Sequence, residues 1–342
     1  MTQSVLRQWS CLVWLAVVTF ILGCSPSVTQ EADVSDTSTR LEQSPSSFRP
    51  VQAAVTVAFT EGPTVDADGN VFFTDLDNNR ILRMTPNGEV STFRQPSNRA
   101  NGLIFDSDWR LLACEGGDGV TALPRVTRTA METGEVEVVA DHFEGKEFHR
   151  PNDLTIDGQG RIYFTDRPEP NPTPDQTGVH GVYRVDLDGG IERILTEPEV
   201  ERPNGIVISP DDRTLYLIET AQYEGGARMI RAYDLGEDGT VSNMRIFHDF
   251  YPGRSGDGMT IDSEGNLYVA AGLHERRGTS ETLDTKTGVH VFAPDGQLKE
   301  FIPIPEDTIT NCAFGGPDLK TLYVTAGKTL FQIRTDIAGT RR

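Results

Sequence analysis

Short apolar runs, punctuated by Gly, Asn, Asp and Pro, fill most of the chain from residue 51 onward, and helical periodicity is nearly absent. Residues 150–157 show the pattern most clearly. They read as a short strand, residues 158–161 as a Gly-containing turn, and residues 162–166 as a second strand rich in β-forming residues. The sequence therefore predicts an all-β protein.

The same strand, turn and strand recur six times, and each copy begins near one residue with a carboxylate or amide side chain. These six anchor residues are Glu61, Asn101, Asn152, Asn204, Asp257 and Asn311. They are separated by 40, 51, 52, 53 and 54 residues. Such a period suits one propeller blade, with two clear strands and room for two more. We therefore expect a six-bladed β-propeller with one anchor at an equivalent place in each blade.

Residues 51–59 precede the first anchor and have no partner strand of their own. The last blade's own strands are expected between Asn311 and Arg334. We expect residues 51–59 to close the ring as the outer strand of that blade, because the edges of a propeller must be protected.

Three regions are expected along the chain: 1–23, 24–50 and 51–342. Residues 1–23 hold one basic residue, Arg7, ahead of an apolar run from Cys11 that has the length of a signal-peptide core and is too short for a permanent membrane span. The sequence around Cys24 resembles a bacterial lipobox, which would make Cys24 lipidated; an ordinary cleaved signal is the alternative. Residues 24–50 are polar and are expected to form a disordered tether, while residues 51–342 form the propeller. The protein would then be exported, at the cell surface or in the periplasm, and anchored to the membrane as a lipoprotein.

The formal net charge is −20, and removal of residues 1–23, which hold Arg7 and no acid, would make it −21. So acidic a protein is not expected to bind nucleic acid, and we expect contact with a membrane only through the N-terminal lipid. Beyond residue 24 the only cysteines are Cys114 and Cys312, which lie in different repeats. We expect both to be buried, inert thiols.

The anchors also predict a metal site. The innermost strands of a propeller line its central channel, so residues at the starts of these strands would face one another at one mouth. Asn, Asp and Glu offer hard oxygen ligands, which suit Ca²⁺ or Mg²⁺ better than tetrahedral Zn²⁺. We expect a divalent cation, in the first place Ca²⁺, and keep Mg²⁺, Mn²⁺ and Zn²⁺ as alternatives. The other interpretation is that such residues are turn formers that hold blade to blade.

Several short motifs surround the anchors. They are Glu61-Gly62-Pro63, Arg99-Ala100-Asn101-Gly102, Ala113-Cys114-Glu115-Gly116-Gly117, Arg150-Pro151-Asn152-Asp153, Arg202-Pro203-Asn204-Gly205, Asp257-Gly258-Met259 and Asn311-Cys312-Ala313-Phe314-Gly315-Gly316. Together, over about residues 55–335, they resemble the SMP-30/gluconolactonase/LRE family, and in particular its bacterial gluconolactonase branch.

This resemblance implies a six-bladed propeller with a catalytic divalent ion, commonly Ca²⁺, on its axis. The family's metal ligands would fall on Glu61, Asn152, Asn204 and Asp257. Its substrate-contacting arginine would fall on Arg150, and Asn101 would face the substrate. The sequence departs from the family at Gly256, where Pro is usual, and over residues 167–181, which are Pro-rich and unlike the usual loop. The second departure bears on the choice of substrate, because this loop should overlie the channel mouth.

A metal with open positions polarises a carbonyl and lowers the pKa of bound water, so such a site could hydrolyse a lactone. Asp257 is the expected general base, because it is a ligand beside two glycines, and Glu61 is expected to neutralise the cation's charge. Arg99, Arg150 and Arg202 each precede an anchor by two residues. They would form a cationic collar that holds a sugar acid or stabilises the oxyanion; pairing with acids of neighbouring blades is the alternative.

The sequence thus predicts a metal-dependent hydrolase that opens a small-molecule lactone, such as an aldonolactone. Two alternatives stay open: a related ester or phosphotriester hydrolase on the same site, and a non-catalytic propeller that binds a partner. The sequence contains no Gly-x-Ser-x-Gly elbow, no His-Glu-x-x-His and no phosphate-binding Gly-rich loop. His149 and His274 lie near anchors, and we expect both to be packed or on the surface.

Overall fold

The computed structural model describes residues 49–117, 122–168 and 173–341. The predictions for residues 1–23, for Cys24 and for nearly all of 24–50 therefore lie outside the described residues. Within the described ranges all regular elements are strands. No helix there is long and apolar enough to cross a membrane.

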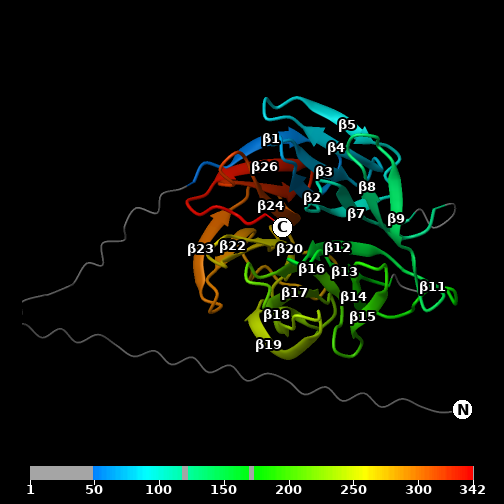
Figure 1. The fold of residues 1–342 in the computed structure, drawn as a ribbon. Helices are drawn as coiled ribbons and strands as arrows, with labels where there is room; N and C mark the ends of the chain where they lie inside the picture. The colour runs from blue at the N-terminus through cyan, green and yellow to red at the C-terminus, as the bar shows by residue number, and fades with distance from the viewer. Residues whose placement is uncertain (1–48, 118–121, 169–172, 342) are drawn as a thin grey trace, which may run out of the picture. The chain divides into compact units, whose positions relative to one another are not determined.

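Six antiparallel four-stranded sheets surround a common centre (Figure 1). Blade 1 is built from β2 (Thr60–Val65), β3 (Val71–Asp75), β4 (Arg80–Met84) and β5 (Val90–Arg94). Blade 2 is built from β6 (Ala100–Phe105), β7 (Leu111–Glu115), β8 (Arg125–Thr129) and β9 (Val136–Ala140). A small hairpin, β10 (His142–Phe143) and β11 (Lys146–Glu147), leads to blade 3, with β12 (Pro151–Ile156), β13 (Ile162–Asp166), β14 (Gly181–Val185) and β15 (Ile191–Thr196).

The second half of the ring repeats this order. Blade 4 is built from β16 (Pro203–Ile208), β17 (Thr214–Thr220), β18 (Arg228–Leu235) and β19 (Val241–Asp249). Blade 5 is built from β20 (Gly256–Ile261), β21 (Leu267–Ala271), β22 (Gly288–Phe292) and β23 (Leu298–Pro303). Blade 6 contains β24 (Ile309–Gly315), β25 (Thr321–Ala326), β26 (Thr329–Arg334) and, from the other end of the folded region, β1 (Gln52–Thr56). The predicted six-bladed propeller is confirmed.

The strand β1 pairs antiparallel with β26, with Gln52 opposite Gln332 and Thr56 opposite Thr329. It is the outermost strand of the blade 6 sheet, the position expected of residues 51–59. Arg49 adds an ion pair to Glu300 of β23 at 2.8 Å. Residues from the start of the folded region thus contact its last two blades.

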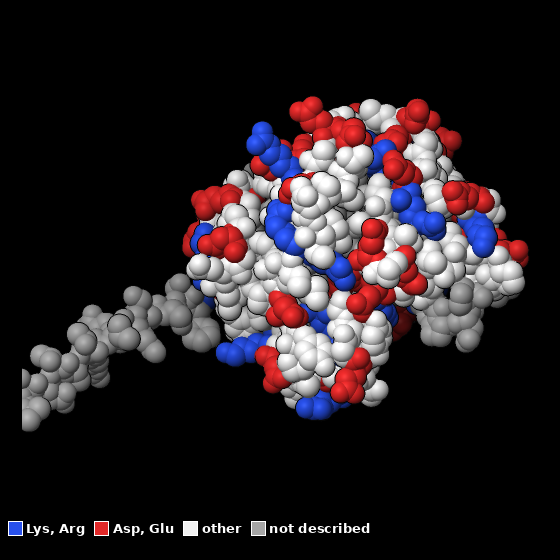
Figure 2. Space-filling model, turned by 90° about the horizontal axis from the view of Figure 1, so that it is seen from below, with Lys and Arg blue, Asp and Glu red and all other residues white. Residues whose placement is uncertain are grey.

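The burial of the strands explains why only two per blade stand out in the sequence. The second strands β3, β7, β13 and β21 are buried at every position, because neighbouring blades cover both faces of the sheet. The outer strands, such as β5 and β19, are largely exposed. Figure 2 looks onto one side of the propeller and shows Asp and Glu spread among Lys and Arg.

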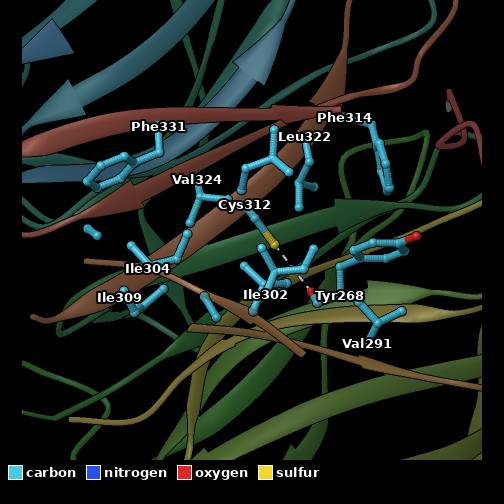
Figure 3. Close-up of a cluster of buried hydrophobic side chains, with 14 residues drawn as sticks. Tyr268, Val291, Ile302, Ile304, Ile309, Cys312, Phe314, Leu322, Val324 and Phe331 are labelled. Carbon is cyan, nitrogen blue, oxygen red and sulfur yellow. Dashed lines mark hydrogen bonds between the residues drawn. The ribbon is translucent and has the colours of Figure 1, made fainter. Parts of the chain in front are cut away.

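The core lies between blades, and the contact of blade 5 with blade 6 illustrates it (Figure 3). The ring of Phe314 meets that of Tyr268 edge-on at 4.9 Å, and the Cys312 thiol donates to the Tyr268 carbonyl at 3.2 Å. Cys312 and Cys114 are both buried and free, as expected. Burial raises the pKa of both thiols, which keeps them protonated and unreactive.

The end of the channel where the inner strands finish is covered by the segment 335–341. Gly339 donates to the Leu319 carbonyl at 2.9 Å, and Ser263 of blade 5 donates to the Ala338 carbonyl at 2.9 Å. Arg341 then lies over the ring of Trp109 in blade 2, 5.6 Å from its centroid. The segment therefore links blades 6, 5 and 2 at the mouth away from the anchors.

Candidate active site

The anchors occupy equivalent positions near the starts of the innermost strands. Five are the second residue of their strand, in β2, β6, β12, β16 and β20, and Asn311 is the third residue of β24. In all six strands the pairing with the second strand shifts register at the anchor or beside it. A bulge of this kind leaves residues unpaired and redirects their side chains. It accounts for how anchors in a sheet can turn toward the channel.

One cavity at this mouth brings most of the predicted site together. It is lined by Glu61, Asn101, Asn204 and Asp257. The Asn204 amide nitrogen donates a short hydrogen bond to Asp257 Oδ1, which joins blade 4 to blade 5. Asn152 is 2% exposed at the matching position of β12. The cavity therefore gathers carboxylate and amide side chains from four blades, and Asn152 is not among the residues that line it.

Asn311 differs from the other anchors. Its amide nitrogen donates to Asp153 Oδ2 at 3.1 Å, and its oxygen accepts from the Cys312 backbone N–H at 2.8 Å. It lines the deeper part of the channel rather than the mouth cavity. For this anchor, the interpretation as a residue that holds blades together fits the contacts.

The inner strands approach one another so closely that side chains are excluded after some anchors. A Cβ atom on Gly62 would lie 2.0 Å from the Asn101 carbonyl oxygen, and one on Gly258 would lie 2.1 Å from Cγ of Asn311. Gly62 also has a φ of 44°, which glycine tolerates better than other residues. The glycine that follows an anchor is therefore part of how the ring brings the anchors together.

Threonines on the second strands form hydrogen bonds with the backbone of the anchors. The Thr165 hydroxyl of β13 donates to the Asn204 carbonyl of the next blade at 2.9 Å, and it accepts from the Asp153 N–H at 3.2 Å. Thr74 of β3 donates in the same way to the Asn101 carbonyl at 3.3 Å. These bonds fix the backbone of an anchor through the blade before it.

Buried carboxylates at the ends of second strands fix the segments that lead into the anchors. Asp166 accepts the backbone N–H of Arg150 at 2.7 Å, and Glu219 accepts that of Arg202 at 2.7 Å. Both arginines come directly before an inner strand. Their starting points, and hence the directions in which their side chains can reach, are set by these bonds.

Carboxylates at and just below this mouth are buried close to one another, and their pKa values reflect it. The pKa of Glu61 lies well above its ordinary value, first because of burial and then because of the nearby charges of Asp257 and Asp153. Burial likewise raises the pKa of Asp153 to about 7. Asp257 is paired with Arg254, whose Nη2 lies 2.5 Å from Oδ2. Converging buried carboxylates of this kind are stabilised by a cation.

The donors at this mouth fit a hard divalent cation. The described residues contain no group of three or more His, Cys, Asp and Glu side chains placed to hold a metal. The candidate set here is different, since it mixes the carboxylates of Glu61 and Asp257 with the amides of Asn152 and Asn204. An amide can offer its oxygen once the group turns, and carboxylate with amide oxygen suits Ca²⁺ or Mg²⁺.

Arginines surround the same cavity. Arg99, Arg150 and Arg202, the arginines of the predicted collar, all line it. Strand alternation does not place Arg99, because this residue precedes β6 with a φ of 55°. The alternative, pairing with acids, does not describe the Arg202 side chain within the described residues, since its Nη1 donates to the Thr220 carbonyl at 3.2 Å.

Sequence reasoning missed three further arginines that line the cavity, Arg167, Arg254 and Arg277. A signal was present for Arg254, which stands three residues before the anchor Asp257 as an Arg-x-x-Asp motif. Arg167 directly follows the strand that ends at Asp166, within the segment 167–181 that departs from the family. This segment therefore contributes to the mouth at its first residue.

The two histidines near anchors lie away from the cavity. His149 is 4% exposed, and its Nε2 accepts the Gly178 backbone N–H at 2.7 Å. It therefore fixes part of the segment 167–181. His274 is exposed, and its backbone N–H donates to Asp307 Oδ1 at 3.2 Å. Neither lines the cavity, in agreement with the expectation of packed or surface positions.

Comparison with known proteins places the chain in a family. Residues 59–328 match the model described as the SMP-30/Gluconolactonase/LRE-like region. The chain belongs to this family. The predicted resemblance to this family is confirmed.

Relatives from this SMP-30/gluconolactonase family align over most of the chain. A gluconolactonase from Zymomonas mobilis is 29% identical, covering 83% of this chain and 80% of the relative. A 6-deoxy-6-sulfogluconolactonase from Pseudomonas putida is 28% identical, covering 75% and 79%. The solved structure of a gluconolactonase from Xanthomonas campestris superposes with a TM-score of 0.70 at 28% identity, covering 83% of this chain and 89% of that one.

Proposed function

We propose that this protein is a lactonase that adds water to the carbonyl carbon of a sugar lactone, with the help of a divalent cation held at the channel mouth. The observation that carries the proposal is the cavity in which Glu61, Asn204 and Asp257 meet beneath arginines. Membership of the SMP-30/gluconolactonase family and relatives named as sugar lactonases support the same reaction.

Glu61, Asn152, Asn204 and Asp257 would hold the cation, which we take to be Ca²⁺, with Mg²⁺, Mn²⁺ and Zn²⁺ as alternatives. When bound, it would polarise the lactone carbonyl and lower the pKa of a water molecule. It would also favour the charged form of Glu61, whose carboxylate is buried with like charges around it.

Residues of the chain transfer the proton and position the group that accepts it. We assign Asp257 as the general base that takes a proton from the attacking water as its oxygen bonds to the carbonyl carbon. When the ring C–O bond breaks, that proton passes to the ring oxygen and leaves a hydroxy acid. Arg254 holds the Asp257 carboxylate, since its own Nη1 is fixed by the carbonyls of Gly272 at 3.3 Å and Ile309 at 3.0 Å.

The collar supplies charge for the tetrahedral intermediate. Arg150 and Arg202 line the cavity from blades 3 and 4, and blade 4 lies beside blade 5, which provides Asp257. A guanidinium near the carbonyl oxygen stabilises the negative charge that forms as water adds. Asn101, at the same mouth, would contact substrate hydroxyls.

Hydrolysis of a neutral aldonolactone, followed by acid release, tests this function with and without Ca²⁺ and after treatment with a chelator. We expect activity that the chelator abolishes and Ca²⁺ restores, and a loss of at least about 100-fold in kcat for Asp257→Asn. Asp68→Asn is the control, because Asp68 is exposed in the turn between β2 and β3 and does not line the cavity, so kcat should stay within about twofold.

The open alternatives are further outcomes of the same assay. Chelator-sensitive cleavage of esters or phosphotriesters, with no opening of lactones, would assign the site to another hydrolase. No chelator-sensitive hydrolysis of any of these substrates would leave a non-catalytic propeller that binds a partner.

We also propose that the protein is exported and held at a membrane through lipidated Cys24. The support is the lipobox-like sequence around this cysteine and the polar residues 24–50 between it and the propeller. Cys24→Ala should move the protein from the membrane fraction to the soluble fraction. If the variant stays in the membrane fraction, Cys24 is not the anchor.

A further inference from the structure

The cavity at the channel mouth is cationic in a protein that is otherwise strongly acidic. Six arginines and four carboxylates line it, Arg99, Arg150, Arg167, Arg202, Arg254, Arg277, Glu61, Asp77, Asp257 and Glu281. Its formal charge is therefore +2, in a chain of net charge −20. Any divalent cation bound there would raise the local charge further. On the side of the molecule seen in Figure 2, acidic and basic residues are mixed.

Arg167 is the least compensated of these arginines. No hydrogen bond or ion pair of its side chain is found within residues 49–117, 122–168 and 173–341. The electrostatic neighbours of its guanidinium are Arg202 and Arg150 on the one hand and Asp257 and Glu61 on the other. Burial in the first place, and Arg202 next, lower its pKa to about 10. Its position thus crowds like charges together at low solvent access.

The backbone holds Arg167 where it is. Asp166 accepts N–H groups of both His149 and Arg150, at 3.0 and 2.7 Å, and a further bond from the Arg167 N–H. These bonds tie the residue that follows β13 to the segment that leads into β12. The backbone that carries the Arg167 side chain is therefore fixed, and a fixed backbone helps to hold a binding group in one position.

The carboxylates in reach of Arg167 have other partners. Asp257 is paired with Arg254 and contacts Asn204, and both Asp257 and Glu61 belong to the proposed cation site. Even a partly buried guanidinium without a paired anion is unfavourable, and the lactone carbonyl carries no net charge. An anionic group elsewhere on the substrate would complete the site, because guanidinium binds carboxylate, phosphate or sulfonate through charge-assisted hydrogen bonds.

We propose that Arg167, together with Arg202, binds a fixed anionic group on the sugar chain of the lactone, so that the enzyme selects acidic sugar lactones over neutral ones. This inference rests on the proposed lactonase function and adds the substrate class. Arg167 is then a specificity-determining residue contributed by the segment that departs from the family pattern.

The test compares D-glucono-1,5-lactone, which is neutral, with 6-phospho-D-glucono-1,5-lactone and D-glucaro-1,4-lactone, which carry a phosphate and a carboxylate. Each is assayed with wild-type protein, Arg167→Met, Arg202→Met and Arg83→Met. Methionine keeps much of the side-chain volume and removes the charge. Arg83 is exposed on β4, away from the mouth, so its variant controls for net charge.

We expect the wild-type kcat/KM for at least one anionic lactone to exceed that for the neutral lactone by about tenfold or more. Arg167→Met and Arg202→Met should each lower the anionic kcat/KM about 10- to 100-fold, mainly through KM, and change the neutral kcat/KM less than about threefold. Arg83→Met should change neither. Added salt should reduce the preference, because it screens the charges.

Failure of this inference is distinguishable from failure of the lactonase function. Chelator-sensitive opening of the neutral lactone with no preference for either anionic one would overturn the substrate class and leave the lactonase intact. An equal loss on all three lactones in Arg167→Met would assign this arginine to the oxyanion instead. If no lactone is opened, the proposed function itself falls, and the inference with it.

Discussion

The bond between Thr165 and Asn204 gives a direct test of how one blade positions the site of the next. Thr165→Val keeps the side-chain shape and removes the hydroxyl. In the native protein this hydroxyl donates to the Asn204 carbonyl at 2.9 Å and accepts the Asp153 N–H at 3.2 Å, and Thr165 is 0% exposed. The change leaves two backbone groups without these partners.

Each buried backbone group that loses its partner costs about 1 kcal/mol or somewhat more, so we expect unfolding free energy to fall by roughly 2 kcal/mol. For a domain of this size the midpoint of thermal unfolding should fall by about 3–6 °C. Because Asn204 is a proposed ligand, Ca²⁺ affinity should fall as well, by about tenfold, as is usual when the support of a metal ligand is removed.

Thr74→Val is the matched control. Thr74 is also 0% exposed and bonds the carbonyl of Asn101 in the next blade, but Asn101 is outside the proposed cation set. Calorimetric titration with Ca²⁺ and thermal unfolding of both variants separate the two effects. The reasoning is refuted if Thr165→Val binds Ca²⁺ as the wild type does, or if both valine variants weaken binding equally.

Three further predictions concern the scaffold. Gly62→Ala should destabilise the protein by several kcal/mol, because the added Cβ would lie 2.0 Å from the Asn101 carbonyl oxygen. Gly88→Ala, also at positive φ but with nothing within 4 Å of the added Cβ, should cost only about 1 kcal/mol in thermal unfolding. Equal losses in the two variants would contradict the close-approach argument. Arg228→Met should lower the unfolding free energy by about 3 kcal/mol in urea, since Arg228 is 1% exposed and donates to four loop carbonyls, those of Ala221, Tyr223, Pro252 and Ser280. An unchanged urea midpoint would show that these loops do not need Arg228. Burial raises the pKa of Glu219 from 4.5 to about 7, so the stability that its protonated form contributes is complete below pH 4.5 and is lost as pH rises through 7. This pH-dependent part of the unfolding free energy should be at most about 3 kcal/mol in the wild type and absent in Glu219→Gln. Parallel curves of stability against pH for the two proteins would contradict the assignment.

The fold was predictable because the repeating sequence pattern consists of residues that are buried in the core. The second strands are buried on both faces, as in β3 and β13, so their apolar runs are continuous and easy to count. The outer strands β5 and β19 are mostly exposed, so burial did not constrain their sequences and their bounds could not be predicted.

The candidate site was predictable to the extent that one strand position repeats. Glu61, Asn204 and Asp257 share that position and line one cavity. Asn311 shares the residue type but bonds Asp153, because in β24 the anchor stands one residue further along the strand. The sequence pattern alone does not resolve a shift of one residue beside a bulge.

The missed arginines come from loops rather than from the repeat. Arg167 is placed by the backbone bonds around Asp166, and Arg277 contacts Thr308 across the mouth. Such contacts join residues far apart in the chain, and no local pattern encodes them. For this reason the sequence predicted a lactonase site but not the full charge of its entrance.

The central claim is that a cation binds among four oxygen-bearing side chains at the channel mouth. Crystals soaked in Ca²⁺ and measured at a wavelength with calcium anomalous signal test it directly. We predict a single strong peak with oxygens of Glu61, Asn152, Asn204 and Asp257 at about 2.3–2.6 Å. A crystal that shows no ion there, with Asn204 still bonded to Asp257, would contradict the account.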